Sequence, residues 1–270
     1  MNLMYCGDRF VKKGIYSSLK TIIKHNEECL NVYILTASIE SHKAIEESFR
    51  VFMEKIIREV NSSSKVYLFD LSREFESYLP YANMNTRFTP LCMLRLFSDK
   101  VGAIPDRILY LDTDVLCLAS FKSFYEMDFK GAELIGVSDR YGAWFFGNVL
   151  KHNYLNSGVL LLNMQLIRES GLFSKCRKMC QEKKMFMPDQ GALNKLSKKR
   201  KVERRYNEQW KIRKNTIFKH FTTFFEFRPL FKAITIKPWD IDLVHKKLKI
   251  FEFDDELNDY LKEKHIIEGE

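Results

Sequence analysis

The sequence predicts an α/β protein built on a mostly parallel β-sheet flanked by helices. Along the first hundred or so residues, short apolar runs alternate with helical patterns, as in successive β-α-β units. The composition agrees, because 46% of the 270 residues are hydrophobic while only 11 are Gly and 6 are Pro, which argues against disorder and against a turn-dense all-β fold. No Pro/Gly linker is visible. We therefore expect one domain over residues 1–240 and a helical C-terminal tail over residues 241–270 that packs on or beside it.

Each expected element follows from its own stretch of sequence. Short apolar runs predict strands, and longer stretches with a helical pattern predict helices. Pro188 suits the first turn of the last helix, where an N–H would have no partner. The expected strands are Leu3–Cys6, Val32–Leu35, Val66–Phe69, Ile108–Leu111, Leu134–Val137 and Gly158–Leu162. The expected helices are Val11–His25, Lys43–Val60, Leu91–Lys100, Gln165–Lys183 and Pro188–Leu196.

Two carboxylates stand where a buried strand is expected to end. The run Ile108–Leu111 is apolar on both faces, as central parallel strands are, and Asp112 and Asp114 follow it directly. In open α/β sheets, ligands bind at this carboxyl edge. Carboxylates a few ångströms apart repel by several kcal/mol at an effective dielectric of ~20, so a proton or a cation must separate them. A divalent metal is the natural occupant, although such a pair taken alone is about as often a solvated turn.

Other folds that bind nucleotides or phosphate match less well. The first strand is followed by Cys6-Gly7-Asp8-Arg9, which has one Gly in place of GxGxxG, and neither GxxxxGKS nor GxxxxGKT occurs. Phosphatases of the haloacid dehalogenase class also use two aspartates one residue apart. Their pair follows the first strand and requires Thr or Val two positions after the second acid, where this chain has Leu116. A metal-dependent phosphatase or phosphotransferase stays as the alternative interpretation.

Four further segments follow the acidic pair. They are Asn156-Ser-Gly-Val-Leu-Leu-Leu-Asn163, Pro188-Asp-Gln-Gly-Ala-Leu-Asn194, His220-Phe-Thr222 and Lys237-Pro-Trp239. With the opening strand and Asp8, they make residues 1–240 resemble the retaining glycosyltransferases of family 8, which include bacterial lipopolysaccharide galactosyltransferases and glycogenin. The resemblance implies a GT-A fold, which is Rossmann-like. It also implies transfer of galactose or glucose from a UDP-sugar to a saccharide, glycolipid or glycoprotein, with retention of the anomeric configuration.

The resemblance further implies a Mn²⁺ ion, with Mg²⁺ as the alternative, that bridges the donor diphosphate. Asp112 and Asp114 match its carboxylate ligands, His220 matches its third ligand, and Thr113 would contact the donor between the two acids. Carboxylate oxygens with one imidazole suit Mn²⁺ better than Ca²⁺. The other interpretation of His220 is a core or surface histidine among phenylalanines.

Lys237 would place its ammonium on the β-phosphate, or would be an ordinary surface lysine. In the family, the histidine and the Lys-Pro-Trp form a compact motif with an intervening Gly. Here sixteen residues without Gly separate His220 from Lys237. Either Phe224–Ile236 is an inserted lid over the diphosphate, or another residue replaces one partner. We prefer the lid, because it keeps both ends of the motif.

The nucleotide side of the donor has three further candidates. Arg95 matches an arginine that contacts sugar and phosphate, although an arginine on a helix commonly only extends along the surface. Cys6 and Asp8 follow the first strand, at the edge where ligands bind. Asp8 would face the uridine, or would only cap the next helix.

Asn156, Asp189 and Gln190 match positions around the transferred sugar, and Asp139 is a candidate sugar contact. Asn156 and Asp139 could instead be turn residues, Asp189 a first-turn acid, and Gln190 a solvated side chain. As the catalytic pair, Asp189 would orient sugar hydroxyls and Gln190 would lie nearest the reacting face. An amide is a weak nucleophile, so we expect front-face transfer through an oxocarbenium-like state.

Cysteine usage and charge indicate location and partners. The six cysteines include no CxxC, and we see neither a signal peptide nor an apolar run of about 18 residues, so we expect a cytoplasmic protein, with the inner face of the membrane as the alternative. Eleven Lys or Arg stand in 195–219 against two Glu. This basic region could contact anionic lipid, a phosphorylated substrate or nucleic acid, or form a solvated helical face. The tail over 241–270 is a second candidate for membrane contact. No nucleic-acid motif is recognisable, so we expect no nucleic-acid partner.

Overall fold

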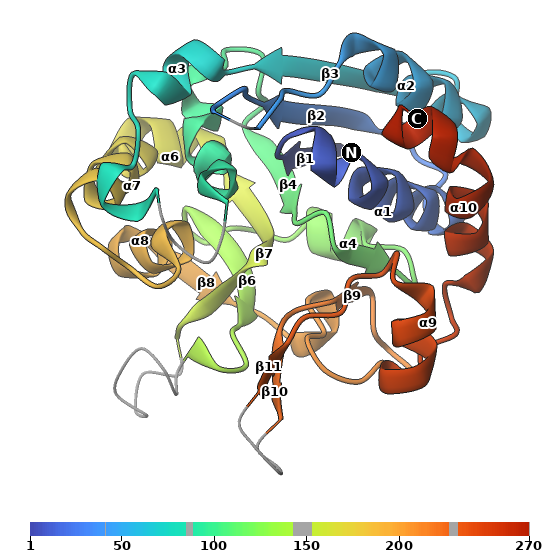
Figure 1. The fold of residues 1–270 in the computed structure, drawn as a ribbon. Helices are drawn as coiled ribbons and strands as arrows, with labels where there is room; N and C mark the ends of the chain where they lie inside the picture. Colours follow the sequence, from blue (N-terminus) through green and yellow to red (C-terminus); the bar gives the residue numbers. More distant parts are fainter. Residues whose placement is uncertain (41, 85–88, 143–152, 227–231, 270) are drawn as a thin grey trace.

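The structure is a computed structural model that describes residues 1–40, 42–84, 89–142, 153–226 and 232–269. Within these ranges the centre is a seven-stranded sheet in the order β3-β2-β1-β4-β7-β6-β8 (Figure 1). Neighbouring strands are parallel except at β7, which runs antiparallel to both β4 and β6. The strands of this sheet are β1 (Asn2–Cys6), β2 (Asn31–Thr36), β3 (Lys65–Asp70), β4 (Arg107–Leu111), β6 (Leu134–Ser138), β7 (Leu155–Asn163) and β8 (Lys199–Lys201).

Two small antiparallel pairs accompany the large sheet. They are β5 (Val115–Cys117) with β9 (Phe218–His220), and β10 (Phe224–Glu226) with β11 (Lys232–Ile234). The α-helices are α1 (Lys12–His25), α2 (Glu47–Val60), α3 (Ser72–Glu76), α4 (Lys122–Tyr125), α6 (Met164–Ser170), α7 (Leu172–Glu182), α8 (Pro188–Leu196), α9 (Ile241–Leu243) and α10 (Asp254–Glu268). The 3₁₀ segments are η1 (Arg9–Val11), η2 (Tyr81–Asn83), η3 (Pro90–Lys100) and η4 (Arg204–Tyr206), and η5 (Val244–Leu248) is a π-helical turn.

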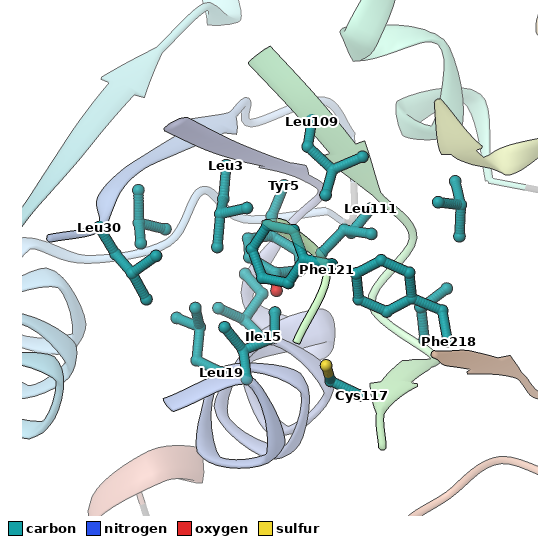
Figure 2. Close-up of a cluster of buried hydrophobic side chains, with 14 of the residues drawn as sticks. Leu3, Tyr5, Ile15, Leu19, Leu30, Leu109, Leu111, Cys117, Phe121 and Phe218 are labelled. Carbon is teal, nitrogen blue, oxygen red and sulfur yellow. The ribbon is translucent and has the colours of Figure 1, made fainter. Parts of the chain in front are cut away.

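The core lies on both faces of the sheet because side chains alternate along each strand. Leu3 and Tyr5 of β1 point to one face, where they pack with α1, α2 and α10, whereas Met4 and Cys6 point to the other, against η3, α6, α7 and α8. Figure 2 shows the first face, with Leu3 and Tyr5 beside Ile15 of α1. The central strands are therefore apolar on both sides, as expected from their sequences.

Some expected elements differ in detail. The single helix expected over Gln165–Lys183 is two helices, because Gly171 ends α6 in the left-handed conformation (φ 65°) and α7 starts after it. The helix expected over Leu91–Lys100 is of the 3₁₀ type. The interpretation of 195–219 as a solvated helical face is wrong, since the segment passes from the end of α8 through β8, η4 and β9.

The C-terminal tail packs against the domain. Its helix α10 lies along α1, where Tyr260 is buried beside Tyr16 with ring centroids 6.4 Å apart and Lys20 pairs with Asp259 at 3.1 Å. This is the core packing that the sequence also allowed, and the boundary at residue 240 stays a prediction. In the described ranges, no helix is both long and apolar enough to cross a membrane. All six cysteines are free thiols.

Candidate functional site

The topology of the sheet gathers the predicted site residues at one edge. The chain runs from β1 out to β2 and β3 and returns to β4 on the other side of β1, which makes a switch point of the kind that binds ligands in α/β sheets. Asp112 follows β4 at this edge. Because β7 is antiparallel to β4, the start of β7 lies there too, with Val159 opposite Leu111 and the Asp112 N–H donating to the Gly158 carbonyl at 2.7 Å. Asn156 therefore lies beside the acidic pair.

A second strand pairing brings His220 close to the two aspartates. In the β5–β9 pair, His220 lies opposite Val115, and the Phe221 N–H donates to the Asp114 carbonyl at 3.0 Å. The His220 Nε2 atom is consequently 3.2 Å from Asp114 Oδ1 and 3.7 Å from Asp112 Oδ2. One ligand atom from each of these three side chains lies within 4.8 Å of the others. The three predicted metal ligands thus form one cluster.

The residues around this cluster fit a small divalent cation. A Cβ atom added to Gly158 would lie 2.1 Å from His220 Cε1 and 2.9 Å from Asp112 Oδ2, so any larger residue would push the ligands apart. Two carboxylates and one neutral imidazole are a donor set that suits Mn²⁺ and also accommodates Mg²⁺.

A chain of hydrogen bonds sets the proton position on His220. The chain ends at Asp139, a carboxylate that only accepts and that takes a hydrogen bond from Asn156 Nδ2 at 2.9 Å. Asn156 Oδ1 in turn accepts from Asn207 Nδ2 at 2.9 Å, which leaves Asn207 Oδ1 to face His220 Nδ1 at 3.2 Å. The network therefore assigns a ring proton to Nδ1, so that Nε2, which faces the carboxylates, is the nitrogen available to a metal ion.

Lys237 reaches the same cluster although sixteen residues separate it from the histidine. The segment between them contains the antiparallel strands β10 and β11, and the hydroxyls of Thr223 and Thr235, which flank this pair, lie 2.6 Å apart. The Lys237 ammonium forms an ion pair with Asp114 Oδ2. Burial alone would raise the pKa of Asp114, but the charge of Lys237, together with the contact to His220, outweighs burial and holds that pKa well below its ordinary value.

The predicted lid over Phe224–Ile236 thus begins with β10 and ends two residues after β11, and these two strands pair with each other. Residues 227–231 lie outside the described residues. A position over the diphosphate stays a prediction.

Arg95 connects the metal cluster to the sugar candidates. It is only 4% exposed, so the interpretation as a surface arginine is wrong. Its Nη2 donates to Asp112 Oδ1 at 2.9 Å, its Nη1 donates to the Ser157 carbonyl at 2.6 Å, and its Nε lies 3.1 Å from Asp189 Oδ2. The guanidinium also lies 3.9 Å from the ring centroid of Tyr110, whose hydroxyl donates to Asp112 at 2.7 Å. The single guanidinium of Arg95 is therefore shared by the carboxylates of Asp112 and Asp189.

Asp189 is the less well satisfied of these carboxylates. Its Oδ2 accepts no hydrogen bond within the described residues, because the nearby Arg95 Nε–H donates to the Cys92 carbonyl. Burial, reinforced by the charge of Asp112, raises the pKa of Asp189 even though Arg95 opposes the shift. A buried carboxylate with a spare acceptor atom is suited to a ligand hydroxyl.

Gln190 is held rigidly rather than solvated. Its Oε1 accepts from the Ser157 N–H at 2.8 Å, and its Nε2 donates to Asp139 Oδ2 at 3.3 Å. The same Asp139 oxygen accepts from Asn156, so these side chains form one network. The alternatives for these two residues do not hold, because Asn156 lies within β7 rather than in a turn and Gln190 is buried rather than solvated.

Most of the predicted residues line one cavity of about 220 Å³, and three do not. Cys6 is buried in the core beneath the site. Asp8 caps the turn that follows β1 by accepting from the Phe10 N–H at 3.0 Å, and it pairs with His42. The Thr113 backbone packs against α1. The predicted residues that line the cavity are Arg95, Asp112, Asp114, Asp139, Asn156, Asp189, Gln190, His220 and Lys237.

Comparison with known sequences identifies the family. A sequence profile of glycosyl transferase family 8 matches residues 2–226. The chain belongs to glycosyltransferase family 8. Family membership leaves no support for a phosphatase or a nucleic-acid-binding module, and the acidic pair follows β4 rather than the first strand.

Three relatives of this family 8 protein have curated names. The chain is 27% identical over 182 residues to the glycosyltransferase GlyF of Streptococcus pneumoniae, covering 66% of this chain and 41% of GlyF. It is 25% identical over 228 residues to the lipopolysaccharide 1,3-galactosyltransferase of Salmonella typhimurium, covering 78% and 64% of the two chains. It is also 25% identical over 258 residues to the lipopolysaccharide 1,2-glucosyltransferase of Escherichia coli, covering 88% and 73%. The chain thus spans less than two thirds of the first two.

Solved structures of similar shape confirm the GT-A fold. An active-site mutant of LgtC superposes with a TM-score of 0.71 at 17% identity, over 96% of this chain and 94% of LgtC. The galactosyltransferase LgtC in complex with donor and acceptor sugar analogs gives 0.67 at the same identity, over 96% of both chains. The glycosyltransferase GlyE of Streptococcus pneumoniae gives 0.63 at 15% identity, over 97% of this chain and 64% of GlyE.

Sequence reasoning missed several residues of the site. Asn207 and Tyr110 contact His220 and Asp112, two of the candidate metal ligands, and Ser157 contacts Gln190 and Arg95. Ser157 and Tyr110 lie inside segments that the sequence singled out, Asn156–Asn163 and Ile108–Leu111, so their position was a usable signal. Asn207 lies in the basic region, and its sequence context contains nothing that points to the histidine.

Proposed function

We propose that this protein is a retaining hexosyltransferase that moves galactose or glucose from a UDP-sugar to a saccharide or glycoconjugate acceptor. The observation that carries the proposal is the cluster of Asp112, Asp114 and His220 in one cavity with Lys237 and Arg95. Three ligands for a divalent cation next to two fixed cations are what a diphosphate leaving group requires.

The metal side of the cavity would serve the leaving group. Asp112, Asp114 and His220 would hold Mn²⁺, with Mg²⁺ as the alternative, and the bound ion would supply Lewis acidity toward the diphosphate oxygens. Lys237 would exchange its contact with Asp114 for the β-phosphate. Because its charge is already in place, it stabilises the negative charge that develops as UDP departs more than it stabilises the ground state.

The sugar side would hold the hexose and guide its transfer. Asp189 would accept hydrogen bonds from sugar hydroxyls, and Arg95 and Asn156 would complete the contacts. The Gln190 oxygen already accepts from the Ser157 N–H, which argues against its attack on the sugar. We therefore favour front-face transfer, in which the C1–O bond to UDP breaks while the acceptor oxygen bonds to C1 on the same face. The acceptor proton passes to the departing phosphate oxygen.

The remaining expectations belong to this proposal. Cys6, Asp8 and Thr113 would lie toward the uridine, near the end of β1. The catalytic domain would be residues 1–240 with the tail docked on it. The protein would act in the cytoplasm or at the inner face of the membrane.

Calorimetry with UDP, in the presence and absence of Mn²⁺, tests the proposal. We expect UDP to bind only with the metal, and UDP-galactose or UDP-glucose to be slowly hydrolysed. Asp114→Asn should abolish the UDP binding and the hydrolysis. Asp255→Asn, on the exposed surface of α10, should change neither of them. UDP binding that is indifferent to Mn²⁺, or no UDP binding at all, would refute the proposal.

A further inference from the structure

An exposed pair of an aromatic ring and a cation stands beside the cavity. Tyr141 and Gln209 line the cavity, and their chain neighbours Arg140 and Trp210 stack on one another, with the guanidinium carbon 3.6 Å from the indole centroid. Trp210 remains 39% exposed, and Phe224 contacts it edge-on at a centroid distance of 6.4 Å. A large exposed indole next to a reaction cavity is a candidate contact for a ligand.

Hydrogen bonds hold this pair in place. The Arg140 N–H donates to Gln209 Oε1 at 2.8 Å, and Gln209 Nε2 donates to the Ser138 carbonyl at 3.0 Å, so the end of β6 is joined to the 207–210 segment. The backbone N–H of Trp210 donates to Glu208 Oε1 at 2.8 Å. Because the backbone on both sides is tied and the guanidinium is stacked, little conformational freedom would be lost on binding.

The pair also carries uncompensated positive charge. Glu208 forms ion pairs with Arg204 at 2.7 Å and with Arg213 at 3.4 Å. In contrast, Arg140 and the exposed Lys211 form no ion pair with an acidic side chain in the part of the chain that the structure describes. Stacking occupies the face of the Arg140 guanidinium, which leaves its in-plane N–H groups for an anion.

We propose that Arg140 and Trp210 form an acceptor subsite that takes the phosphate or carboxylate group of an anionic saccharide. The inference rests on the proposed glycosyltransferase function and adds the chemical class of the acceptor. A sugar ring packs on an aromatic surface while its anionic substituent pairs with the fixed guanidinium. The position beside Tyr141 and Gln209 brings such a saccharide to the mouth of the cavity. A membrane contact through the basic region 195–219 is the competing interpretation, and the vesicle experiment below distinguishes it from the subsite.

Titration of small saccharides tests this subsite directly. The protein is saturated with Mn²⁺ and UDP, so that the donor phosphate contacts are filled, and glucose, glucose 6-phosphate and glucuronic acid are added in a calorimeter. We expect at least one anionic sugar to bind about tenfold tighter than glucose, as a charge-assisted hydrogen bond predicts. Arg140→Gln should remove this preference and leave UDP binding unchanged. Arg140→Lys should retain part of it, because the charge stays while the planar fork is lost.

Arg73→Gln is the matched control, since it removes an exposed arginine from α3 and should change nothing. Equal affinity for neutral and anionic sugars, or a preference that survives in Arg140→Gln, would overturn the subsite. Loss of binding to phosphatidylglycerol vesicles in Arg140→Gln, with the sugar preference intact, would also overturn it in favour of a membrane contact. Absence of Mn²⁺-dependent UDP binding in the unaltered protein would instead refute the proposed function.

Discussion

The two halves of the cavity, the metal side and the sugar side, shift the pKa of a buried aspartate in opposite directions. In the metal half, Asp114 has Lys237 and His220 as partners, and its pKa lies far below the ordinary range. In the sugar half, the pKa of Asp189 is raised, because burial dominates and its one cation, Arg95, is shared with Asp112. Both carboxyls are buried, so the cations that face each of them, rather than burial itself, decide the direction in which its pKa shifts. Under the proposed function, Asp114 would thus offer a lasting negative charge to a metal ion, and Asp189 would offer an acceptor to sugar hydroxyl groups.

Exchanging one carboxylate in each half should separate binding from transfer. Asp114→Asn should lower the rate of transfer by about 10³-fold and abolish Mn²⁺-dependent UDP binding, because the metal loses a ligand. Asp189→Asn should lower the rate by about 10²-fold while UDP binding stays within about twofold, because only the sugar loses its orientation. Rate measurements with UDP-galactose and UDP-glucose, together with calorimetry, give both quantities. If Asp189→Asn also lost UDP binding, the two halves would not be independent.

A methyl group at Gly158 should disrupt the metal half alone. In Gly158→Ala, the new Cβ would overlap His220 and Asp112, so we expect Mn²⁺ affinity to fall by about 10²-fold, the effect of a displacement of about 1 Å. Gly102→Ala is the matched control, because a Cβ there meets nothing within 4 Å. Titration of Mn²⁺ into the protein without nucleotide measures the difference. Unchanged affinity in Gly158→Ala would show that the metal does not lie between these ligands.

Removal of the hydrogen bond to His220 should have a smaller effect. Asn207→Ala leaves the ring free to rotate and to change tautomer, so we expect Mn²⁺ affinity about tenfold weaker, as for other outer-shell partners of metal ligands. Asn215→Ala removes an exposed amide of the same region and should leave the Mn²⁺ affinity unchanged. The same metal titration tells them apart. Equal affinities would mean that Asn207 has no part in orienting His220.

The smallest expected effect is on stability and has opposite signs in the two halves. Between the ordinary pKa of a carboxyl and the raised pKa of Asp189, the unfolded chain has lost a proton that the folded protein keeps, so stability falls as pH rises. Asp189→Asn removes this loss, and we expect its Tm at pH 7 to be about 2–4 °C above that of the unaltered protein. The two melting curves should converge near pH 4, where the carboxyl is largely protonated in both states.

Asp114 should show the reverse behaviour. Its lowered pKa contributes stability that is fully present above the ordinary carboxyl pKa and is lost as pH falls toward the lowered value. Asp114→Asn should therefore melt below the unaltered protein at pH 7, and the gap should close at acid pH. Melting curves of metal-free protein measured from about pH 2 to pH 7 compare the two variants, because the Asp114 contribution is lost only below the ordinary carboxyl pKa. If both substitutions changed the Tm at pH 7 in the same direction, the opposite pKa shifts of Asp114 and Asp189 would be contradicted.

The strands with a clear apolar run were predictable because their burial is encoded locally. The runs in β1, β2, β4 and β7 are apolar on both faces, and their positions agree with the structure to within three residues. In contrast, β5, β8 and β9 were missed, since each has three residues and forms only through pairing with a distant partner. Lys199–Lys201 even has the charge of a surface loop.

The sequence by itself determined which side chains are available for the chemistry: the acidic pair after a buried strand, the histidine, the lysine and the Asp189-Gln190 pair. Only the tertiary structure decided how they act together. The β4–β7 and β5–β9 pairings bring Gly158 and His220 to Asp112, and the same folding places Asn207 behind the histidine and Arg140 on Trp210. These contacts join residues far apart in the chain, so their distances and their shared charges follow from strand pairing and not from local sequence.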